Sequence, residues 1–196
     1  MSKNKAVAAL QSFFGWFLNV YIEIFRGTPM IVQSMVIFYG SAQAFNISLD
    51  RTWAAIFIVS INTGAYMSEI VRGGILAVDT GQFEAATALG MTHGQTMRKV
   101  VLPQVVRNIL PATGNEFVIN IKDTSVLNVI SVVELYFTGN TVATQNYQYF
   151  PTFTIIAVIY FILTFTITRI LRYIERRLDS DTYTTGANQM QVKEVK

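Results

Sequence analysis

Two stretches of this chain carry no charged side chain over the length that a membrane crossing requires. No Asp, Glu, Lys or Arg occurs between Arg26 and Asp50, or from Phe150 to Thr168. A helix that crosses the hydrocarbon core of a bilayer needs about 20 mainly apolar residues. Over the whole chain 52% of residues are hydrophobic and 14% are charged, whereas a soluble domain is about 25% charged. These features predict an integral membrane protein.

We expect an all-α, polytopic fold with one transmembrane domain, 1–178, and a polar, disordered tail, 179–196. The aromatic stretch "FFGWFLNVYIEIFRG" either lies in the membrane interface or extends the first spanning helix. The third span carries Glu116, Lys122 and Asp123 and is a poorer membrane segment than the others. The four expected spans are 28–45, 53–78, 111–137 and 150–170, with a loop at 79–110.

Basic residues predict the orientation of these spans. They gather before the first span, in the central loop and after the last span, and two expected spans separate each neighbouring pair of basic regions. Because cytoplasmic loops of membrane proteins are enriched in Lys and Arg, all three regions fit the cytoplasmic side. We therefore expect both termini of this chain in the cytoplasm.

Composition excludes several kinds of site. The chain has no Cys and one His, which excludes thiolate catalysis and disulfides and makes a metal site built from histidines implausible. The net charge is only +3, without a dense basic stripe, so we expect no nucleic-acid partner. No span carries a convincing pair of catalytic groups, so we do not expect an enzyme.

The central loop has the punctuation of two short helices. Asp79 or Thr80 can cap a helix that starts near Gln82, and Gly90 can end it in a left-handed conformation. "THGQ" has the pattern of a capping box at the start of a second helix. We expect Pro103 to kink this second helix and Pro111 to open the next span. A first helix of about 8 residues is too short to be stable alone in water, so it rests on its own chain or on another protein.

Polar side chains inside the spans form two stripes. In the second span Asn62, Tyr66 and Glu69 share a side, and Glu69 also has the spacing to pair with Arg72. In the third span, read as one continuous helix, the polar residues fall within an arc of about 100°. Such stripes line a watery path or form hydrogen bonds between helices that hold the bundle together; the sequence leaves both open. The candidate substrate-path residues are Asn62, Tyr66, Glu69, Glu116, Asn120, Asp123, Thr124 and Ser131, and Glu134 continues the second stripe.

The loop also resembles the EAA loop of permease subunits of bacterial ATP-binding-cassette importers. That pattern is filled by Glu84, Ala85, Ala86 and Gly90, followed by the Leu102-Pro103 pair. The stretches "VYIEIFRGTPMIVQ", "NTGAYMSEIVRGGI" and "NEFVINIKDTSVLNVI" are similar to the branch of this family that imports polar amino acids. The resemblance implies that the first loop helix couples to the ATPase subunit, through Gln82, Phe83, Glu84, Ala85, Ala86, Leu89 and Gly90.

The resemblance also implies partners. These are ABC ATPase subunits, a second permease subunit that is identical or different, an extracytoplasmic amino-acid-binding protein and the lipids of the bacterial inner membrane. ATP and Mg²⁺ would be bound by the ATPase, and this chain would bind no cofactor. Family members usually have one more helix at the N-terminus, so we expect an upstream helix. The sequence does not identify the amino acid, and the alternative function is a stand-alone secondary transporter or channel.

Overall fold

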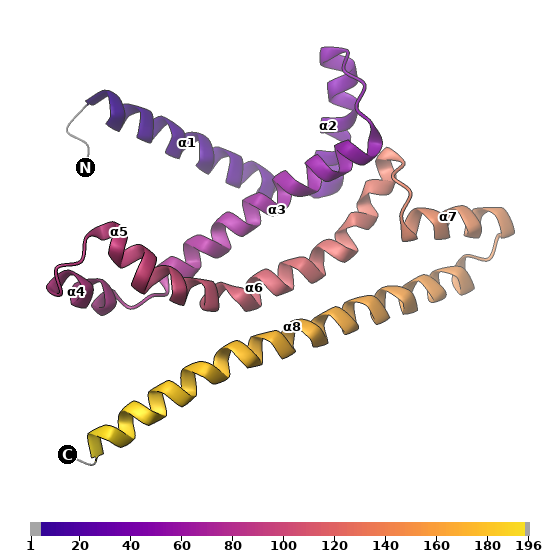
Figure 1. The fold of residues 1–196 in the computed structure, drawn as a ribbon. Coiled ribbons are helices and arrows are strands. Elements are labelled where there is room, and N and C mark those ends of the chain that lie inside the picture. The colour runs from indigo at the N-terminus through magenta and orange to yellow at the C-terminus, as the bar shows by residue number, and fades with distance from the viewer. Residues whose placement is uncertain (1–4, 195–196) are drawn as a thin grey trace. The chain divides into compact units, whose positions relative to one another are not determined.

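The computed structural model describes the backbone of residues 5–194 and the side chains of residues 7–177. Within this part of the chain every regular element is a helix (Figure 1), which confirms the all-α prediction. Three of these helices have the length and apolar composition to cross a membrane. The number of spans rises to four if a bent pair of helices is counted as one span. The chain divides into two compact units, Met1–Ser68 with Asn120–Ala157, and Glu69–Ile119 with Val158–Lys196.

The first two helices are separated at a proline. Helix α1 (Lys5–Gly27) ends before Thr28, and α2 (Met30–Phe45) begins after Pro29, which has an extended backbone at φ −65° and ψ 138°. Proline has no N–H and disfavours helical geometry in the residue before it, which favours a break in the helix at this point.

This break changes the expected first span, 28–45. That region is an apolar helix of only 16 residues, shorter than the roughly 20 that a perpendicular crossing needs. The stretch Val7–Gly27 of α1, with 21 residues, is instead one of the three helices of membrane length and composition. The aromatic stretch before Pro29 is thus a helix in its own right rather than an extension of α2.

The expected second and fourth spans lie in long helices. Helix α3 (Arg51–Leu76) contains most of 53–78, and α8 (Tyr149–Glu194) contains 150–170; Tyr149–Arg177 is its candidate membrane stretch. The predicted disorder of the tail, 179–196, falls on side chains outside the described residues and stays a prediction.

The third span is not the continuous helix 111–137 that the sequence predicted. Helix α6 (Leu102–Asp123) contains Pro111 in its interior and gives way to a 3₁₀ helix, η2 (Thr124–Ile130). Ser131 then adopts a left-handed conformation at φ 61° and ψ 35°. Helix α7 (Leu135–Asn146) follows at an angle of 55° to the preceding helix, so this is a broken span or a re-entrant segment.

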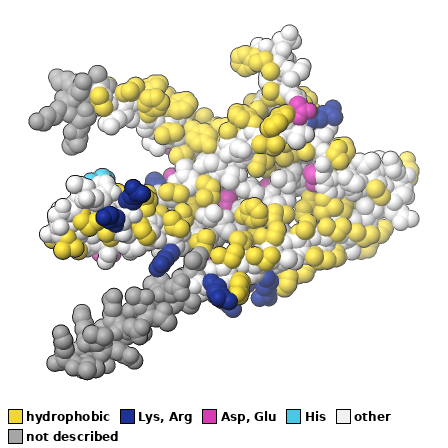
Figure 2. Space-filling model, in the orientation of Figure 1, with side chains coloured by type: hydrophobic (Ala, Val, Ile, Leu, Met, Phe, Trp, Pro, Cys, Tyr) yellow, Lys and Arg dark blue, Asp and Glu magenta, His cyan; other side chains and the backbone are white. Residues whose placement is uncertain are grey.

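Large apolar side chains are exposed along the helices of membrane length (Figure 2). In α1 they include Phe13, Phe14 and Trp16, and in α8 Phe161 and Ile162, each more than half exposed. Such extensive apolar exposure does not suit a protein in water, but it suits helices whose outer sides contact lipid.

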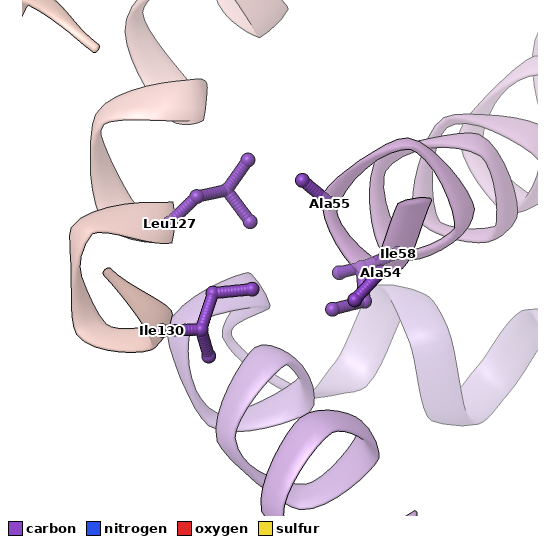
Figure 3. Packing of buried hydrophobic residues seen from close by; sticks show 5 residues of the cluster. All are labelled: Ala54, Ala55, Ile58, Leu127 and Ile130. Carbon is purple, nitrogen blue, oxygen red and sulfur yellow. The ribbon is translucent and has the colours of Figure 1, made fainter. Parts of the chain in front are cut away.

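A small apolar core joins α3 to the 3₁₀ helix η2 in the first unit. Ala54, Ala55 and Ile58 of α3 face Leu127 and Ile130 of η2 (Figure 3), and all five side chains are buried. Alanine at two of the α3 positions lets the backbones approach closely. This packing stabilises the 3₁₀ geometry, which has poorer hydrogen bonds than an α-helix.

A second core, in the second unit, supports the central loop. Val78, Val101 and Val105 are buried, with Phe83 and Ile109 packed against them. The central loop therefore rests on apolar residues of its own chain.

Candidate functional site

The first part of the central loop is a capped helix, α4 (Thr80–Ala88), of nine residues. The carboxylate of Asp79 accepts a hydrogen bond from the backbone N–H of Gly81 at 2.6 Å. This interaction satisfies one of the N–H groups that a helix start leaves without a partner. The predicted cap at Asp79 is confirmed, and the helix begins two residues earlier than Gln82.

The turn after α4 depends on Gly90. This residue has φ +74°, in the left-handed region where glycine has no steric penalty. The predicted stop at Gly90 is therefore confirmed. The chain then reverses, and the backbone N–H of Met91 donates to the carbonyl of Ala86 at 3.1 Å.

A capping box starts the second helix of the loop. The hydroxyl of Thr92 accepts from the Gln95 N–H at 3.4 Å, and the Gln95 side chain accepts from the Thr92 N–H at 2.9 Å. The prediction from "THGQ" is thus confirmed. This second helix is α5 (His93–Thr96), and it lies beside α4, above it in the view of Figure 1.

The segment between α5 and α6 is a π-helix, η1 (Met97–Val101). The N–H of Leu102 donates to the carbonyl of Met97, five residues back. Pro103 follows directly and offers no N–H to the chain. The expected disturbance near Pro103 therefore takes the form of a π-helical turn, a common response to strain in the helical ladder.

The seven residues predicted to couple to an ATPase divide into two groups. Phe83 is half-buried against the valine core and Ala86 is 3% exposed, so both anchor α4 to its own chain. The coupling role that the resemblance implies for all seven residues stays a prediction, and in this structure these two side chains face their own chain rather than solvent. Leu89, by contrast, is 82% exposed. The remaining exposed residues of the group are Gln82, Glu84, Ala85 and Gly90.

Asn62, the first candidate path residue, takes part in a buried polar contact. Its side-chain amide donates to the Gln33 side-chain oxygen at 2.9 Å and to the Phe25 carbonyl at 3.3 Å. The Gln33 amide in turn donates to the carbonyls of Phe25 at 2.9 Å and Thr28 at 2.8 Å. Both amides therefore donate to carbonyls that the break at Pro29 leaves without a helical partner. Asn62 thus has a structural role in this chain.

Gln33 was missed by the sequence analysis. It lies in an uncharged stretch that was interpreted as a membrane span, and its partners lie up to 29 residues away. The signal that could have indicated it is Pro29. A helix broken by proline leaves carbonyls without partners, and a nearby amide is the natural donor.

The other two polar residues of the second span also have partners. The guanidinium of Arg26 lies over the Tyr66 ring, 5.7 Å from its centroid. Arg72 donates two hydrogen bonds to the Glu69 carboxylate, at 2.7 and 2.9 Å. The pairing of Glu69 with Arg72, one of two alternatives from the sequence, is thus present in the second unit.

The polar stripe of the third span is shorter than predicted, because the helix ends at Asp123. Within α6, Asn120 accepts a hydrogen bond from Thr63 at 3.2 Å, while Glu116 is 9% exposed. Thr124 belongs to the 3₁₀ helix and donates to the carbonyl of Ile121 at 3.0 Å.

Two members of the predicted stripe lie beyond the break. Ser131 forms the left-handed residue of the bend. Glu134 accepts from the backbone N–H groups of Tyr136 at 2.7 Å and Phe137 at 2.6 Å, and so caps α7. A continuous stripe from Glu116 to Glu134 is therefore wrong, because its arc assumed α-helical geometry throughout. Of the eight candidate path residues, Glu69 and Glu116 belong to the second unit and the other six to the first.

Helices of membrane length, with a capped helical hairpin between α3 and α6, define an integral membrane protein. The chain belongs to the family of binding-protein-dependent transport system inner membrane components, whose pattern matches residues 6–180. It is thus a permease subunit of an ABC transporter, as the resemblance implied.

Named relatives agree with this assignment. The chain is 41% identical over 173 residues to the glutamine transport system permease protein GlnP of Escherichia coli, covering 86% of this chain and 79% of the relative. It is 37% identical over 168 residues to the arginine transport system permease protein ArtQ of Bacillus subtilis, covering 86% and 77%. A crystal structure of an amino acid ABC transporter with histidines matches with 41% identity and a TM-score of 0.78, covering 90% of this chain and 79% of that chain.

Proposed function

We propose that this permease subunit imports polar amino acids, driven by ATP hydrolysis in a partner subunit. This proposal rests on the sequence identity of about 40% to relatives named for glutamine and arginine transport. A solved neighbour at 41% identity is an amino acid ABC transporter with histidines. All three names refer to amino acids with polar side chains.

Helix α4 is the coupling element in this proposal. It is anchored on one side by Phe83 and Ala86, and it exposes Gln82, Glu84 and Leu89. A short helix held by its own chain can transmit a movement of the partner to α3 and α6, because it cannot shift independently of the valine core. Gly90 directs the chain back toward this core.

The ATP chemistry belongs to the partner. The sequence contains no G-x-x-x-x-G-K-[ST] loop, the feature that cradles nucleotide phosphates in P-loop ATPases. The ATPase would therefore bind ATP and Mg²⁺, and this chain would bind no cofactor and catalyse no reaction. A second permease subunit and an extracytoplasmic amino-acid-binding protein complete the proposed assembly.

The end of α6 is the proposed part of the substrate path. Asp123 is exposed in the isolated chain, and Asn120 lies one turn before it on a similar side. A carboxylate in a membrane segment is costly unless it faces water or a polar partner. Thr124 and Ser131, beside the bend, also belong to this proposed path. The side chains of Asn62, Tyr66 and Glu69 already pair within the chain, so they have less capacity to bind a substrate.

Location and orientation follow the basic residues. The bacterial inner membrane is the proposed site, with both termini of this chain in the cytoplasm. Reporters fused before Met1 and after Lys196 should read the same side of the membrane. Reporters on opposite sides would contradict the proposed topology.

The decisive experiment compares Glu84→Lys with His93→Lys. Both positions are exposed in the hairpin and both changes add positive charge, but only Glu84 lies on α4. Glu84→Lys should reduce ATPase co-purification and ATP-driven uptake of glutamine or arginine, while His93→Lys retains both. Uptake that persists without any ATPase subunit would instead support a stand-alone secondary transporter or channel.

A further inference from the structure

A polar cavity of about 210 Å³ lies between α6 and α8 in the second unit. Its wall on α6 comes from positions 111, 114, 115 and 118, and its wall on α8 from positions 168, 171, 172 and 175. The two helices are in contact at Gly114, where a Cβ would lie at van der Waals distance, 3.4 Å, from Leu171.

The cavity is lined by one cation and one anion. Arg172 is exposed and Glu175 is half-buried, and within the described part of the chain neither has a hydrogen bond or an ion pair. The amide of Asn115 adds a neutral donor from α6. A ligand that offers both an anion and a cation matches this pair of charges, because each charge then gains a partner.

The cavity does not belong to the proposed substrate path. On α6 its wall and the polar positions 116, 120 and 123 are centred roughly 150° apart, at about 100° per residue. One side of α6 therefore carries the polar stripe, and nearly the opposite side carries the cavity. A ligand here would contact the outer surface of the subunit rather than the translocated molecule.

An exposed apolar track leads into the cavity along α8. Phe161 and Phe165 are 64% and 48% exposed, and their ring centroids are 5.7 Å apart. These rings share a side of α8 with Thr168, Arg172 and Glu175, within an arc of about 80°. Figure 2 shows the same progression on α8, with an apolar surface followed by basic side chains toward its C-terminal part.

The order of these groups matches the order of groups in a phospholipid. Along α8 the aromatic track comes first, then Arg172, and Glu175 lies about 4.5 Å further along the axis. A phosphatidylethanolamine has its acyl chains first, then its phosphate, and its primary ammonium group outermost. Arg172 can donate two hydrogen bonds to phosphate oxygens, and the ammonium can donate to Glu175.

We propose that this cavity binds the headgroup of phosphatidylethanolamine, with an acyl chain lying along Phe165 and Phe161. Phosphatidylglycerol fits less well, because it presents no cation to Glu175 and this carboxylate repels its phosphate. A phosphatidylcholine headgroup fits less well too, because its quaternary ammonium has no N–H to donate.

The test measures the lipids that remain bound to the full-length chain. The protein is purified in mild detergent from membranes that contain phosphatidylethanolamine and phosphatidylglycerol, and bound lipids are counted by native mass spectrometry. Retained phosphatidylethanolamine should exceed phosphatidylglycerol. Arg172→Gln and Glu175→Gln should each reduce its retention about tenfold, the size expected when a hydrogen bond to a charged group is lost.

Two variants separate the site from general effects of charge. Arg177→Gln removes a positive charge from the opposite side of α8, where Arg177 donates to Tyr173, and should leave retention unchanged. Glu175→Lys should reverse the preference in favour of phosphatidylglycerol. A misfolded protein cannot acquire a new preference, so this reversal also shows that the variant is folded.

Three results would overturn the proposal. The first is equal retention of both lipids by the wild-type chain, and the second is retention that Arg172→Gln and Glu175→Gln leave unchanged. The third is another occupant. Release of the lipid by free glutamine or arginine would assign the cavity to a soluble zwitterion, and efficient disulfide formation between two Thr168→Cys chains in membranes would assign it to a second copy.

Discussion

The side-chain amide of Asn62 donates to the side-chain oxygen of Gln33 at 2.9 Å, and both side chains are at least 93% buried. This contact connects α3 to the start of α2. The same two amides satisfy the Phe25 carbonyl at the end of α1. These contacts hold three helices together at Pro29, where α1 and α2 are separated.

Replacing Gln33 by Leu should destabilise the protein by about 1–3 kcal/mol. The buried Asn62 amide would lose the Gln33 oxygen, and the carbonyls of Phe25 and Thr28 would each lose one donor. Thermal unfolding in detergent measures the effect. Gln104→Leu is the control, because among the described residues Gln104 donates only to the carbonyl of Val100, one helical turn before it.

The double variant tests whether Gln33 and Asn62 act together. The combined Gln33→Leu and Asn62→Leu change should cost less than the sum of the two single changes, because the second change breaks a contact that is already lost. Strict additivity would show that the two amides do not depend on each other.

Adjacent glycines in α3 should respond in opposite ways to alanine. A Cβ on Gly74 would collide with the side chain of Ile109, whereas a Cβ on Gly73 meets nothing within 4 Å. Gly74→Ala should therefore destabilise the protein, and Gly73→Ala should stabilise it by up to about 1 kcal/mol through helix propensity. Thermal unfolding of both variants checks this. Adding Ile109→Ala to Gly74→Ala should recover part of the loss, and failure to do so would contradict the proposed contact.

Asn and Val at Gly90 should behave differently in transport. The backbone there has φ +74°, which Asn tolerates and a β-branched residue does not. Gly90→Asn should retain most of the uptake and ATPase binding, while Gly90→Val should lose both as the turn is displaced. Membrane insertion of both variants, measured by their yield in membranes, should stay normal. Equal uptake by the two variants would show that the left-handed turn is not needed for coupling.

Single cysteines should map the water-accessible part of α6. The native sequence contains no Cys, so each introduced thiol is the only one. Asn120→Cys and Asp123→Cys should react with small charged thiol reagents in the assembled complex. Phe161→Cys should not react, because its position on α8 faces lipid and a thiolate does not form there. Inert thiols at both α6 positions, with and without ATP turnover, would remove this segment from the proposed path.

The local signals of the loop were sufficient to predict its structure from sequence. The Asp79 cap, the left-handed Gly90 and the pair of Thr92 with Gln95 each depend on residues at most three positions apart. Interactions of this range are encoded in short patterns, because the chain has little freedom to place such neighbours elsewhere. The all-helical class and the family also followed from the sequence, through long apolar runs and several ordered motifs.

Contacts between residues distant in the sequence determined the features of the fold that the sequence did not predict. The sequence could not indicate that Phe83 packs against the chain's own valine core, because that core includes Val101 and Val105 from beyond the turn. Nor could it indicate the break after Asp123. The apolar pattern there suits a helix, yet Leu127 and Ile130 pack against α3 only when the chain adopts the 3₁₀ geometry and bends at Ser131. Helical periodicity determines which residues share a side, but tertiary packing determines where a helix ends and what each side contacts.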